Sequence, residues 1–571
     1  MSQFRLTGSR RGLAIVLTLA LARPALADEF QRHAVVAQEQ NAAEVGRDVL
    51  RGGGNAIDAA VATAFALAVT HPAAGNLGGG GFLVYFDAKT KQVTTFDFRE
   101  AAPAAATERM YLDESGALLR GHRNGARAAG VPGTVRGLEL AHKKYGTKAW
   151  KELVLPAERL AREGFVLTPN LARALNFELG ASSGNRLGAF PTSRAAFAKP
   201  DATPWKAGDR LVQPDLAQTL ERIASDGADG FYKGRTADLI ADYCKANGGI
   251  ITRSDLADYQ AHERPATHVT FRGHDVYGVG PPSSGGVVIG LALNILEPFD
   301  LKGYGSQSPE ALHLVTEAMR RAFLVRALEL GDPDFTKIDV ARLVSKEYAK
   351  SLSQGLDLTK ATPSAALAPD LRLMESGNHT THFSVVDADG NAVALTYTLE
   401  DAYGGKAVVA GAGFLLNNEM GDFNLIPGRT DTSGHIGTSA NLIAPGKRML
   451  SSQSPTILLK DGRVRLVTGS PGGRTIPNTV LWMVLQVAEF GQPLERAMLA
   501  PRSHHQWFPD VLLLEGRDWD EKTLEKLRSM GHTFDTGAVL GVANSIEISL
   551  KTGTIHGVPD KRAADSHAAG D

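Results

Sequence analysis

The hydrophobic pattern of the chain changes its period repeatedly, which predicts helices and strands interleaved along the whole length. Residues 40–50 carry apolar positions at helical spacing and end at the glycine run 52–54, a typical helix stop. Asn55 then precedes an alanine-rich segment that continues to about Val69, so Asn55 is expected to cap a second helix. Asp58 inside this segment argues against a membrane span.

The rest of the chain divides into helical and strand-like patterns. Two strands are expected around the polar turn of GNLGGGGFLVYFDAKTKQVTTFDFRE. Helices are expected within 135–165, 214–246 and 308–330, strands within 265–278 and 381–399, and short strands between long loops within 411–470. The last residues, KRAADSHAAGD, have the composition of a frayed tail. Interleaved elements of both kinds predict an α/β or α+β fold.

The clearest local element is a hairpin at 381–399. The runs HFSVV and AVALTYT flank the segment DADGN, which is a strong turn signal. Folding the hairpin about residue 389 places Thr398 opposite Thr380, within hydroxyl reach, unless the register slips by one residue.

The amino-acid composition limits the kinds of partner and chemistry that the protein can have. The 571 residues have a formal net charge of -1, with 43% hydrophobic and 22% charged residues, which indicates a folded globular protein. This balance gives no support to a nucleic-acid partner or an electrostatic membrane partner. The single cysteine, Cys244, excludes an intrachain disulfide, and it is expected to be packed rather than reactive. His504 and His505 lack a second ligand pair at metal spacing, so buried structural histidines are expected there.

The N terminus has the pattern of an export signal. Three arginines in the first eleven residues precede the apolar run 12–21 and an A-x-A site that ends at Ala27. We therefore expect a signal peptide over 1–27 and a mature chain that begins at Asp28. The alternative is a short membrane anchor, but the apolar run is short for a bilayer. SRRGLA also resembles a twin-arginine signal, and a bacterial periplasmic or secreted protein is expected.

Thr380 is the first candidate for chemistry. A threonine hydroxyl becomes a useful nucleophile when the residue is N-terminal, because its free α-amine then serves as the base. That arrangement requires a break between His379 and Thr380, and the polar run SGNH before Thr380 fits an exposed scissile bond. The alternative is a threonine pair that simply opens a strand. His382, two residues further on the same strand face, either touches the site or packs.

A glycine turn and a group of charged residues are further candidates. In TGSPGGRTIPNTVLWMVLQV, Gly472 and Gly473 precede a predicted helix and can present N–H groups to an oxyanion, unless the turn is only structural. Arg99 ends a predicted strand and can clamp a carboxylate, or else pairs with Asp97 or Glu100. The remaining candidates are polar loop residues, with Ser451 and Ser452 as donors to the same anion and Glu419 and Asp422 as partners of an ammonium group.

The ordered motifs GGNAIDAAVA, HPAAGNLGGGGF, DFREAAP, PPSSGG, TTHFSVVDADGNAVALTYT, LLNNEMGDF, KRMLSSQSPT and GSPGG resemble the γ-glutamyltranspeptidase (glutathione hydrolase) family. The resemblance runs from about residue 33 to 560. It implies an N-terminal-nucleophile hydrolase with an α+β fold, a four-layer αββα sandwich. It also implies that the chain cuts itself between His379 and Thr380 into a large subunit, 28–379, and a small subunit, 380–571.

The same resemblance implies a role for each candidate. Thr380 attacks a γ-glutamyl amide, Thr398 lies against it, and Gly472 and Gly473 stabilise the oxyanion. The acyl-enzyme is released by water or by an amino acid or peptide amine, and no metal or organic cofactor is implied. The substrate head is held at its α-carboxylate by Arg99, Ser451 and Ser452, and at its α-ammonium by Glu400, Glu419 and Asp422.

Two departures from the family pattern bear on substrate binding. Glu400 stands where some members carry asparagine, and the loop 427–441 has the length of a lid but carries Ser433 in place of an aromatic gate. The nearest alternative function is a glutaryl or cephalosporin acylase of the same fold, whose substrate lacks the α-ammonium. A periplasmic protein that only binds γ-glutamyl compounds is the alternative of a different class.

Overall fold

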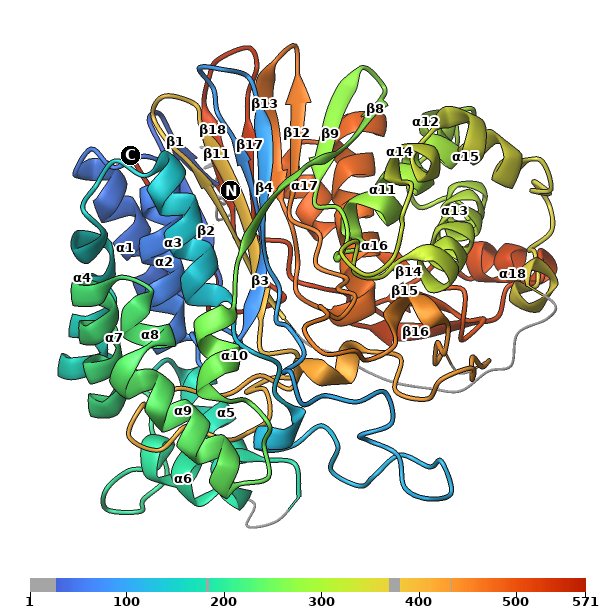
Figure 1. Ribbon diagram of the computed structural model, residues 1–571. Helices are drawn as coiled ribbons and strands as arrows, with labels where there is room; N and C mark the ends of the chain where they lie inside the picture. The colour runs from blue at the N-terminus through green and yellow to red at the C-terminus, as the bar shows by residue number, and fades with distance from the viewer. Residues whose placement is uncertain (1–26, 181–183, 369–379, 433) are drawn as a thin grey trace, which may run out of the picture.

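Two seven-stranded antiparallel sheets lie face to face between two layers of helices in the computed structural model, which describes residues 27–180, 184–368, 380–432 and 434–571 (Figure 1). The first sheet has the order β19 (His567–Gly570), β2 (Ala34–Ala37), β10 (Thr381–Val386), β11 (Ala392–Thr398), β3 (Gly80–Phe86), β4 (Val93–Phe98), β7 (His262–Pro265). The second has the order β1 (Asp28–Phe30), β18 (Ile555–Val558), β17 (Ser545–Ile548), β13 (Arg463–Thr468), β12 (Thr456–Lys460), β9 (His274–Gly278), β8 (Thr267–Phe271).

The space between the sheets is filled by alternate residues of their strands. Phe82 and Val84 of β3 belong to the same apolar cluster as Ile457 of β12 and Ile546 of β17. Leu83, between them on β3, belongs instead to the cluster on the helical side. Successive side chains of a strand point to opposite faces, so β3 is buried on both. The four-layer αββα arrangement predicted from the family resemblance is confirmed.

Helices cover the outer face of each sheet. Helix α2 is buried at every position because it lies between the first sheet and the neighbouring helices α1 and α4. The first layer and its extension contain α1 (Gln40–Arg51), α2 (Ala56–Thr70), α3 (Thr134–Tyr145), α4 (Trp150–Glu163), α5 (Pro169–Leu179), α6 (Pro191–Phe197), α7 (Pro214–Asp226), α8 (Asp229–Tyr232), α9 (Gly234–Ala246) and α10 (Arg253–Asp258). The other side of the molecule contains α11 (Gly285–Leu296), α12 (Leu301–Tyr304), α13 (Pro309–Glu329), α14 (Val340–Leu343), α15 (Lys346–Ser353), α16 (Ile476–Val484), α17 (Leu494–Leu499) and α18 (Glu521–Ser529).

Short strands complete the secondary structure. A small three-stranded sheet lies outside the main sheets and contains β14 (Ser503–His504), β15 (Leu512–Glu515) and β16 (Phe534–Ala538). A two-stranded ribbon, also outside them, contains β5 (Phe165–Val166) and β6 (Arg210–Leu211).

Within the described ranges, the structure contains no helix with the length and apolar character needed to cross a membrane. The predicted signal peptide lies outside the described residues apart from Ala27.

The local signals near the N terminus are confirmed. The Asn55 side chain accepts a 3.0 Å hydrogen bond from Asp58 N–H, and Asp58 accepts one of 3.0 Å from Asn55 N–H, which is a capping box at the start of α2. The glycine run 52–54 ends α1 as expected. Residues 135–165 form the two helices α3 and α4, and the single strand-like segment 265–278 is the hairpin β8–β9.

Two expectations about the second half of the chain are corrected, the first of them only in part. The short strands predicted within 411–470 are present as β12 and β13, but between 411 and 455 the described residues form turns, short 3-10 helices and single bridges and no strand, because their polar groups bond to distant loops rather than to a sheet edge. The tail is not frayed, since β19 pairs with β2 and buries Ala568 and Ala569. A four-residue strand made mostly of alanine and glycine has no recognisable pattern, so only the existing edge of β2 determines it.

Candidate active site

The hairpin β10–β11 brings the two predicted threonines together. Thr381 pairs with Tyr397, so the next position along the ladder places Thr380 opposite Thr398, as the turn arithmetic predicts. Asp387 holds the turn by accepting hydrogen bonds from the N–H groups of Asp389 and Asn391 at 3.0 and 2.9 Å. The other Asp387 oxygen accepts a 2.9 Å bond from Ala56 N–H at the start of α2. The hairpin is therefore fixed at both its turn and its register.

Thr398 is buried at the end of β11, where it joins three parts of the site. Its hydroxyl oxygen accepts a 2.7 Å hydrogen bond from Glu400 N–H, and its carbonyl accepts a 2.9 Å bond from the Asn76 side chain. Gly80 of β3 pairs with Thr398 on the far side, and a Cβ at neighbouring Gly79 would lie 1.9 Å from the Thr398 carbonyl oxygen. The glycines of GNLGGGGF thus allow β3 to approach β11 closely.

The side chains of Thr381 and His382, which follow Thr380, bond to other residues of the protein interior. The Thr381 hydroxyl donates to Gln38 Oε1. His382 Nδ1 and Nε2 lie 2.8 Å from Thr396 Oγ1 and 3.1 Å from Ser384 Oγ, and complete burial lowers the pKa of His382 to about 3. A histidine with this pKa is neutral at pH 7 and already has two partners. Of the two alternatives for His382, the structure favours packing.

The glycine turn after β13 has a backbone that only glycine adopts easily. Gly472 has φ 129° and Gly473 has φ 57°, and both lie in the region that disfavours residues with a Cβ. Thr475 N–H and the Thr475 hydroxyl donate to the Gly472 carbonyl at 3.1 and 2.8 Å, which closes the turn. In the part of the chain that the structure describes, neither the Gly472 nor the Gly473 N–H donates to a protein acceptor. Both donors are available to an oxyanion.

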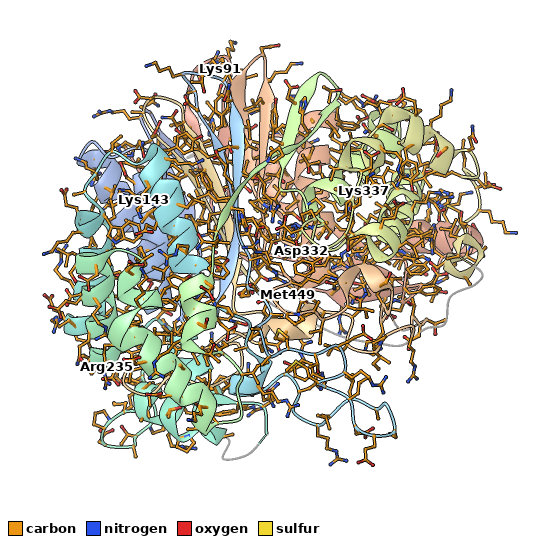
Figure 2. All side chains as sticks on the ribbon, in the orientation of Figure 1. Lys91, Lys143, Arg235, Asp332, Lys337 and Met449 are labelled. Atoms are coloured by element: carbon orange, nitrogen blue, oxygen red, sulfur yellow. The ribbon has the colours of Figure 1, made fainter. Side chains whose placement is uncertain are left out.

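Arg99 is fully buried in an ion cluster that includes two of the predicted substrate partners. Its Nη1 donates to Glu419 Oε1, its Nη2 donates to Asp422 Oδ2 at 2.5 Å, and its Nε donates to the Met449 carbonyl at 3.2 Å. Burial opposes the charge of Arg99, but Glu419, Glu100 and Asp422 outweigh it and raise the pKa of Arg99. Arg99 of the predicted carboxylate clamp and Glu419 and Asp422 of the predicted ammonium clamp therefore form one cluster, bonded to Met449, which lies near the centre of the view in Figure 2.

Three buried carboxylate oxygens in this region have no hydrogen-bond donor among the described residues: Glu100 Oε1, Glu400 Oε2 and Glu419 Oε2. Glu419 Oε2 and Glu400 Oε2 are both enclosed, and neither accepts a hydrogen bond from any described residue. Burial raises the pKa of both carboxyls, although Arg99 and Arg123 oppose the shift. Because buried polar atoms are nearly always paired, these oxygens require a donor that the described part of the protein does not supply.

Arg123 explains how Glu400 is tolerated where some family members carry asparagine. Its Nη2 donates to Glu400 Oε1 and lies 3.4 Å from Asp401 Oδ1. Glu400 has φ 77°, an uncommon conformation for a residue with a side chain, which turns the chain sharply after β11. The side chain of Glu400 consequently points back toward the 419–422 turn, 3.7 Å from the position of a Cβ on Gly421.

Ser451 and Ser452 are held by a second loop and by a buried arginine. Ser284 N–H and Oγ donate to the Ser451 carbonyl at 2.9 and 2.8 Å, which assigns a role to the PPSSGG motif. Arg326 Nη2 donates to Ser452 Oγ and Arg326 Nε donates to Ser284 Oγ, both at 3.0 Å. Because the Ser452 oxygen accepts from Arg326, its own O–H is available to donate to an anion.

The loop 427–441 folds back on itself beside the site. Gly428 N–H donates to the Gly437 carbonyl at 2.8 Å, and Arg474 donates to the Gly434 carbonyl. Residues of this loop and of the adjacent 421–426 turn line a cavity of about 460 Å³ that also contains Asp422 and Arg326. The loop thus has the position of a wall or lid, as its length predicts. Ser433 and His379 lie outside the described residues.

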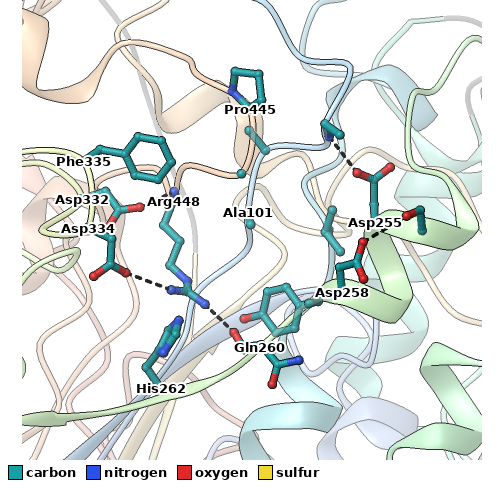
Figure 3. Close-up of a pocket in the computed structure, with 16 residues that line it drawn as sticks. Ala101, Asp255, Asp258, Gln260, His262, Asp332, Asp334, Phe335, Pro445 and Arg448 are labelled. Atoms are coloured by element: carbon teal, nitrogen blue, oxygen red, sulfur yellow. Dashed lines mark hydrogen bonds and ion pairs between the residues drawn. The ribbon is translucent and has the colours of Figure 1, made fainter.

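A second cavity, of about 520 Å³, is lined by Ala101, Tyr259 and Arg448 among others (Figure 3). Arg448 Nε and the Tyr259 hydroxyl donate to the Arg99 carbonyl at 3.3 and 2.7 Å. Arg448 also donates to the Gln260 carbonyl at 2.5 Å and lies 3.7 Å from Asp334. Arg448 and Tyr259 thus bond to the backbone of Arg99, while the Arg99 guanidinium points to Glu419 and Asp422. We therefore assign Arg448 and Tyr259 to positioning Arg99.

Sequence reasoning missed Arg123, Arg326 and Arg474. Arg326 is buried within α13, but this helix also buries Arg320 and Arg321, so no local signal distinguishes Arg326 from its neighbours. Arg474 follows the glycine turn directly but belongs to no general motif, and nothing around Arg123 distinguishes it from a surface residue.

The residues expected to be inert are so in the structure. Cys244 is buried, which raises its pKa to about 12, and His504 and His505 are buried with pKa values lowered to about 4. His504 Nδ1 lies 2.7 Å from Asn478, and His505 Nε2 lies 3.2 Å from Asp510. Over the described ranges, no cluster of three or more His, Cys, Asp or Glu side chains has the arrangement of a metal site.

Comparison with known proteins gives consistent results. The sequence profile described as Gamma-glutamyltranspeptidase matches residues 42–570. The chain is 45% identical over 541 residues to the "Glutathione hydrolase proenzyme" of Escherichia coli (strain K12), covering 94% of this chain and 91% of that protein. Among solved structures, it is similar to cephalosporin acylase from Bacillus halodurans (TM-score 0.82, 24% identity, 100% and 99% of the two chains). It is also similar to γ-glutamyltranspeptidase of Helicobacter pylori (TM-score 0.55, 40% identity, 63% and 96%).

Proposed function

Since the chain belongs to the γ-glutamyltranspeptidase family and is accordingly a γ-glutamyltransferase and glutathione hydrolase, we propose that it matures by cutting itself between His379 and Thr380. The products are a large subunit, 28–379, and a small subunit, 380–571, which remain packed together because β10 and β11 lie in the middle of a sheet whose neighbours β2 and β3 come from the large subunit. Cleavage gives Thr380 a free α-amine beside its hydroxyl, opposite Thr398.

The proposed reaction uses the freed threonine as nucleophile and base together. Thr380 Oγ attacks the γ-carbonyl of the substrate while the α-amine of Thr380 takes the hydroxyl proton. The N–H groups of Gly472 and Gly473 stabilise the oxyanion, and its collapse expels the leaving amine, which takes up the proton. Water, or the amine of an amino acid or peptide, then attacks the acyl-enzyme and restores the threonine.

The observation that carries the substrate assignment is a pair of buried oxygens that accept no hydrogen bond from a described residue. They are Glu419 Oε2, whose neighbouring Oε1 bonds to the Arg99 guanidinium, and Glu400 Oε2, whose neighbouring Oε1 bonds to Arg123. An α-amino acid head brings an ammonium with three N–H donors and a carboxylate with acceptors. We assign the ammonium to Glu400, Glu419 and Asp422, and the carboxylate to Arg99, Ser451 and Ser452. Arg326 supports the second group by directing the Ser452 hydroxyl outward.

The preference for a γ-glutamyl over a glutaryl anilide tests this assignment against the acylase alternative. A glutaryl group lacks the ammonium and leaves buried carboxylates without donors, so we expect kcat/KM to favour the γ-glutamyl compound by about 100-fold or more. The measurement is the release of nitroaniline from both substrates, with and without glycylglycine as acceptor. Equal rates, or faster release from the glutaryl compound, contradict the assignment, and binding without turnover favours the non-enzymatic alternative.

The oxyanion role of the glycine turn gives a separate prediction. Gly472→Ala places a Cβ 2.5 Å from Thr475 Oγ1 on a backbone at φ 129°, so the turn must shift and its N–H groups lose their alignment. We expect kcat to fall by about 100-fold with a small change in KM. Gly462→Ala is the matched control, because Gly462 has φ 67° in an open turn and its Cβ would meet no atom within 4 Å. An equal loss of kcat in both variants would mean that only folding is affected.

The N-terminal pattern supports export, and we propose a periplasmic or secreted location for the processed enzyme. Cell fractionation tests this directly, with the large subunit expected to begin at Asp28. Activity that stays with the cytosolic fraction, on a chain that retains residues 1–27, contradicts the proposal.

A further inference from the structure

Gln453 is a buried glutamine whose side-chain amide has no partner among the described residues. Its exposed fraction is 2%, and neither Oε1 nor Nε2 forms a hydrogen bond with the described part of the chain. Its backbone, in contrast, is bonded: the N–H donates to Ser451 Oγ at 3.1 Å, and the carbonyl accepts from Ser283 Oγ at 2.6 Å. Because enclosed amides are nearly always paired, this side chain has capacity for a ligand that brings both an acceptor and a donor.

The alternation of β12 places the Gln453 side chain between the two sheets. Ile457 of β12 belongs to the inter-sheet cluster, and Leu458 belongs to the cluster on the helical side of its sheet. Ahead of the strand, Ser452 keeps to the helical side, because its Oγ accepts a hydrogen bond from Arg326 of α13. Gln453 follows Ser452 directly and precedes Ile457 by four positions, so its side chain points into the space between the sheets.

The end of the sandwich that Gln453 occupies also contains the proposed reaction centre. Strand β12 is antiparallel to β13, so the residues before Thr456 lie alongside the segment that leads from β13 to the oxyanion turn. A Cβ on Gly469 of that segment would lie 2.4 Å from the His382 ring of β10. His382 and Thr380 are two positions apart and share the inter-sheet face of their strand. Strand β11 also packs against β12 and β13, so Gln453 faces the strand ends that carry the threonines.

The residues assigned to the amino acid head approach this space from the first sheet. Gly80 lies on the inter-sheet face of β3, and a Cβ there would lie 2.8 Å from Glu100 Oε2. The turn that contains Arg99 and Glu100 therefore reaches over β3, which packs against β12. Ser451, two positions before Gln453, bonds to its N–H. A substrate head bound by Arg99 and Ser451 consequently lies within reach of the Gln453 amide.

We propose that Gln453 binds both halves of the amino acid head, with Nε2 donating to the α-carboxylate and Oε1 accepting from the α-ammonium. This inference rests on the proposed function and adds a specificity-determining residue to it. One amide can make both bonds, because its donor and acceptor diverge from one carbon, as do the ammonium and carboxylate of an α-amino acid. A substrate that carries both groups therefore gains more from Gln453 than a compound that carries one.

Gln453→Met tests the proposal, because methionine is similar in length but lacks the amide donor and acceptor. Two hydrogen bonds to charged groups are lost, so we expect KM for γ-glutamyl-4-nitroanilide to rise about 10-fold, with kcat within about 2-fold of wild type. Competitive inhibition by three acids separates the two bonds. L-Glutamate should bind the variant about 10-fold more weakly, but glutarate, without the ammonium, and 4-aminobutanoate, without the α-carboxylate, only about 3-fold more weakly.

A purely structural role of Gln453 would give a different result. Replacing an unpaired buried amide by an apolar side chain of similar shape should keep or raise the thermal midpoint, while KM still rises. Gln486→Met is the matched control, because Gln486 is 2% exposed and its Nε2 has no described partner. It lies in the π-helical turn Leu485–Glu489, about 20 Å along the helix from the oxyanion turn, and its loss should leave KM and the three inhibition constants unchanged.

A second variant keeps the proposal testable if Gln453→Met does not mature into two chains. Gln453→Asn retracts the amide by one methylene and is expected to raise KM as well. If either folded variant keeps the wild-type KM, or if the three acids are weakened by the same factor, the inference is wrong while the proposed function stands. If wild type releases no nitroaniline from the γ-glutamyl compound, the proposed function fails and this inference fails with it.

Discussion

Thr380→Ala is expected to leave the protein as a single chain without γ-glutamyl hydrolysis. The substitution removes the hydroxyl that both self-cleavage and the acyl-enzyme require, so kcat should fall by at least about 10,000-fold. A denaturing gel shows one band for the variant and two for the wild type, and N-terminal sequencing of the smaller wild-type band should read Thr-Thr-His-Phe. Two bands from Thr380→Ala would overturn the assignment of the nucleophile.

The neighbouring threonine supplies the matched control. Thr381 has the same side chain one position later, but it is buried at the first position of β10 and its hydroxyl bonds to Gln38. Thr381→Ser keeps that hydroxyl and is expected to process and to hydrolyse at rates near the wild type. Thr380→Ser, which retains a hydroxyl at the proposed nucleophile, should still yield two bands. Loss of processing in Thr381→Ser would instead point to a general sensitivity of the strand.

Arg99→Ala is expected to have the second largest effect, on both substrate binding and stability. It removes the proposed partner of the α-carboxylate and leaves the buried Glu419 and the partly exposed Asp422 without their cation. Truncating one member of a buried charge pair costs about 2–5 kcal/mol, so kcat/KM for a γ-glutamyl anilide should fall by about 100-fold or more, mainly through KM. The thermal midpoint should fall by several degrees in the same variant.

The controls for Arg99 separate binding from folding. Arg253→Gln, on the surface of α10, should change neither KM nor the thermal midpoint. Processing of Arg99→Ala into two chains is expected to continue, because the Arg99 guanidinium bonds to Met449 and Glu419 in loops of the small subunit rather than to Thr380. An unchanged KM in a correctly processed Arg99→Ala enzyme would contradict its assignment to the carboxylate.

The structure adds an effect on stability to the effect on binding that the sequence predicts for the loss of Arg99. In the sequence, Arg99 lies at a strand end beside Asp97 and Glu100, and as a substrate clamp its loss is expected to affect substrate binding. In the structure its guanidinium bonds to Glu419, Asp422, Glu100 and the Met449 carbonyl. Its backbone carbonyl accepts hydrogen bonds from Arg448 and Tyr259. The stability of the loop cluster therefore depends on Arg99 as well, and the thermal measurement must accompany the kinetic one.

Much of the site follows from local sequence. The DADGN turn determines the register of β10 and β11, because an Asp–Gly hairpin turn leaves little freedom to the flanking strands. That register places Thr398 opposite Thr380 before any tertiary contact is known. The glycine pair 472–473 likewise marks its turn in the local sequence. Its φ values of 129° and 57° strain any residue with a Cβ, whereas glycine adopts them at little cost.

Other features depend on contacts between distant segments and leave no local pattern. The strand β19 exists because β2 offers an unpaired edge, and the loops of 411–455 are ordered by bonds to residues hundreds of positions away, such as Asn417 with Gly130. The pairing of Glu400 with Arg123, and of Ser452 with Arg326, likewise joins side chains 277 and 126 positions apart.

The sequence by itself determined the helix caps, the hairpin register, the glycine turn and, through its ordered motifs, the family and the four-layer fold. These properties depend on backbone conformation and on periodicity, which act over a few residues. Only the tertiary structure decided which charges neutralise one another. Arg99 joins Glu419 and Asp422 into one cluster, while Arg326, Arg429 and Arg474 are left without described carboxylate partners. Charge balance in a buried site depends on distances across the fold, and sequence spacing does not encode those distances.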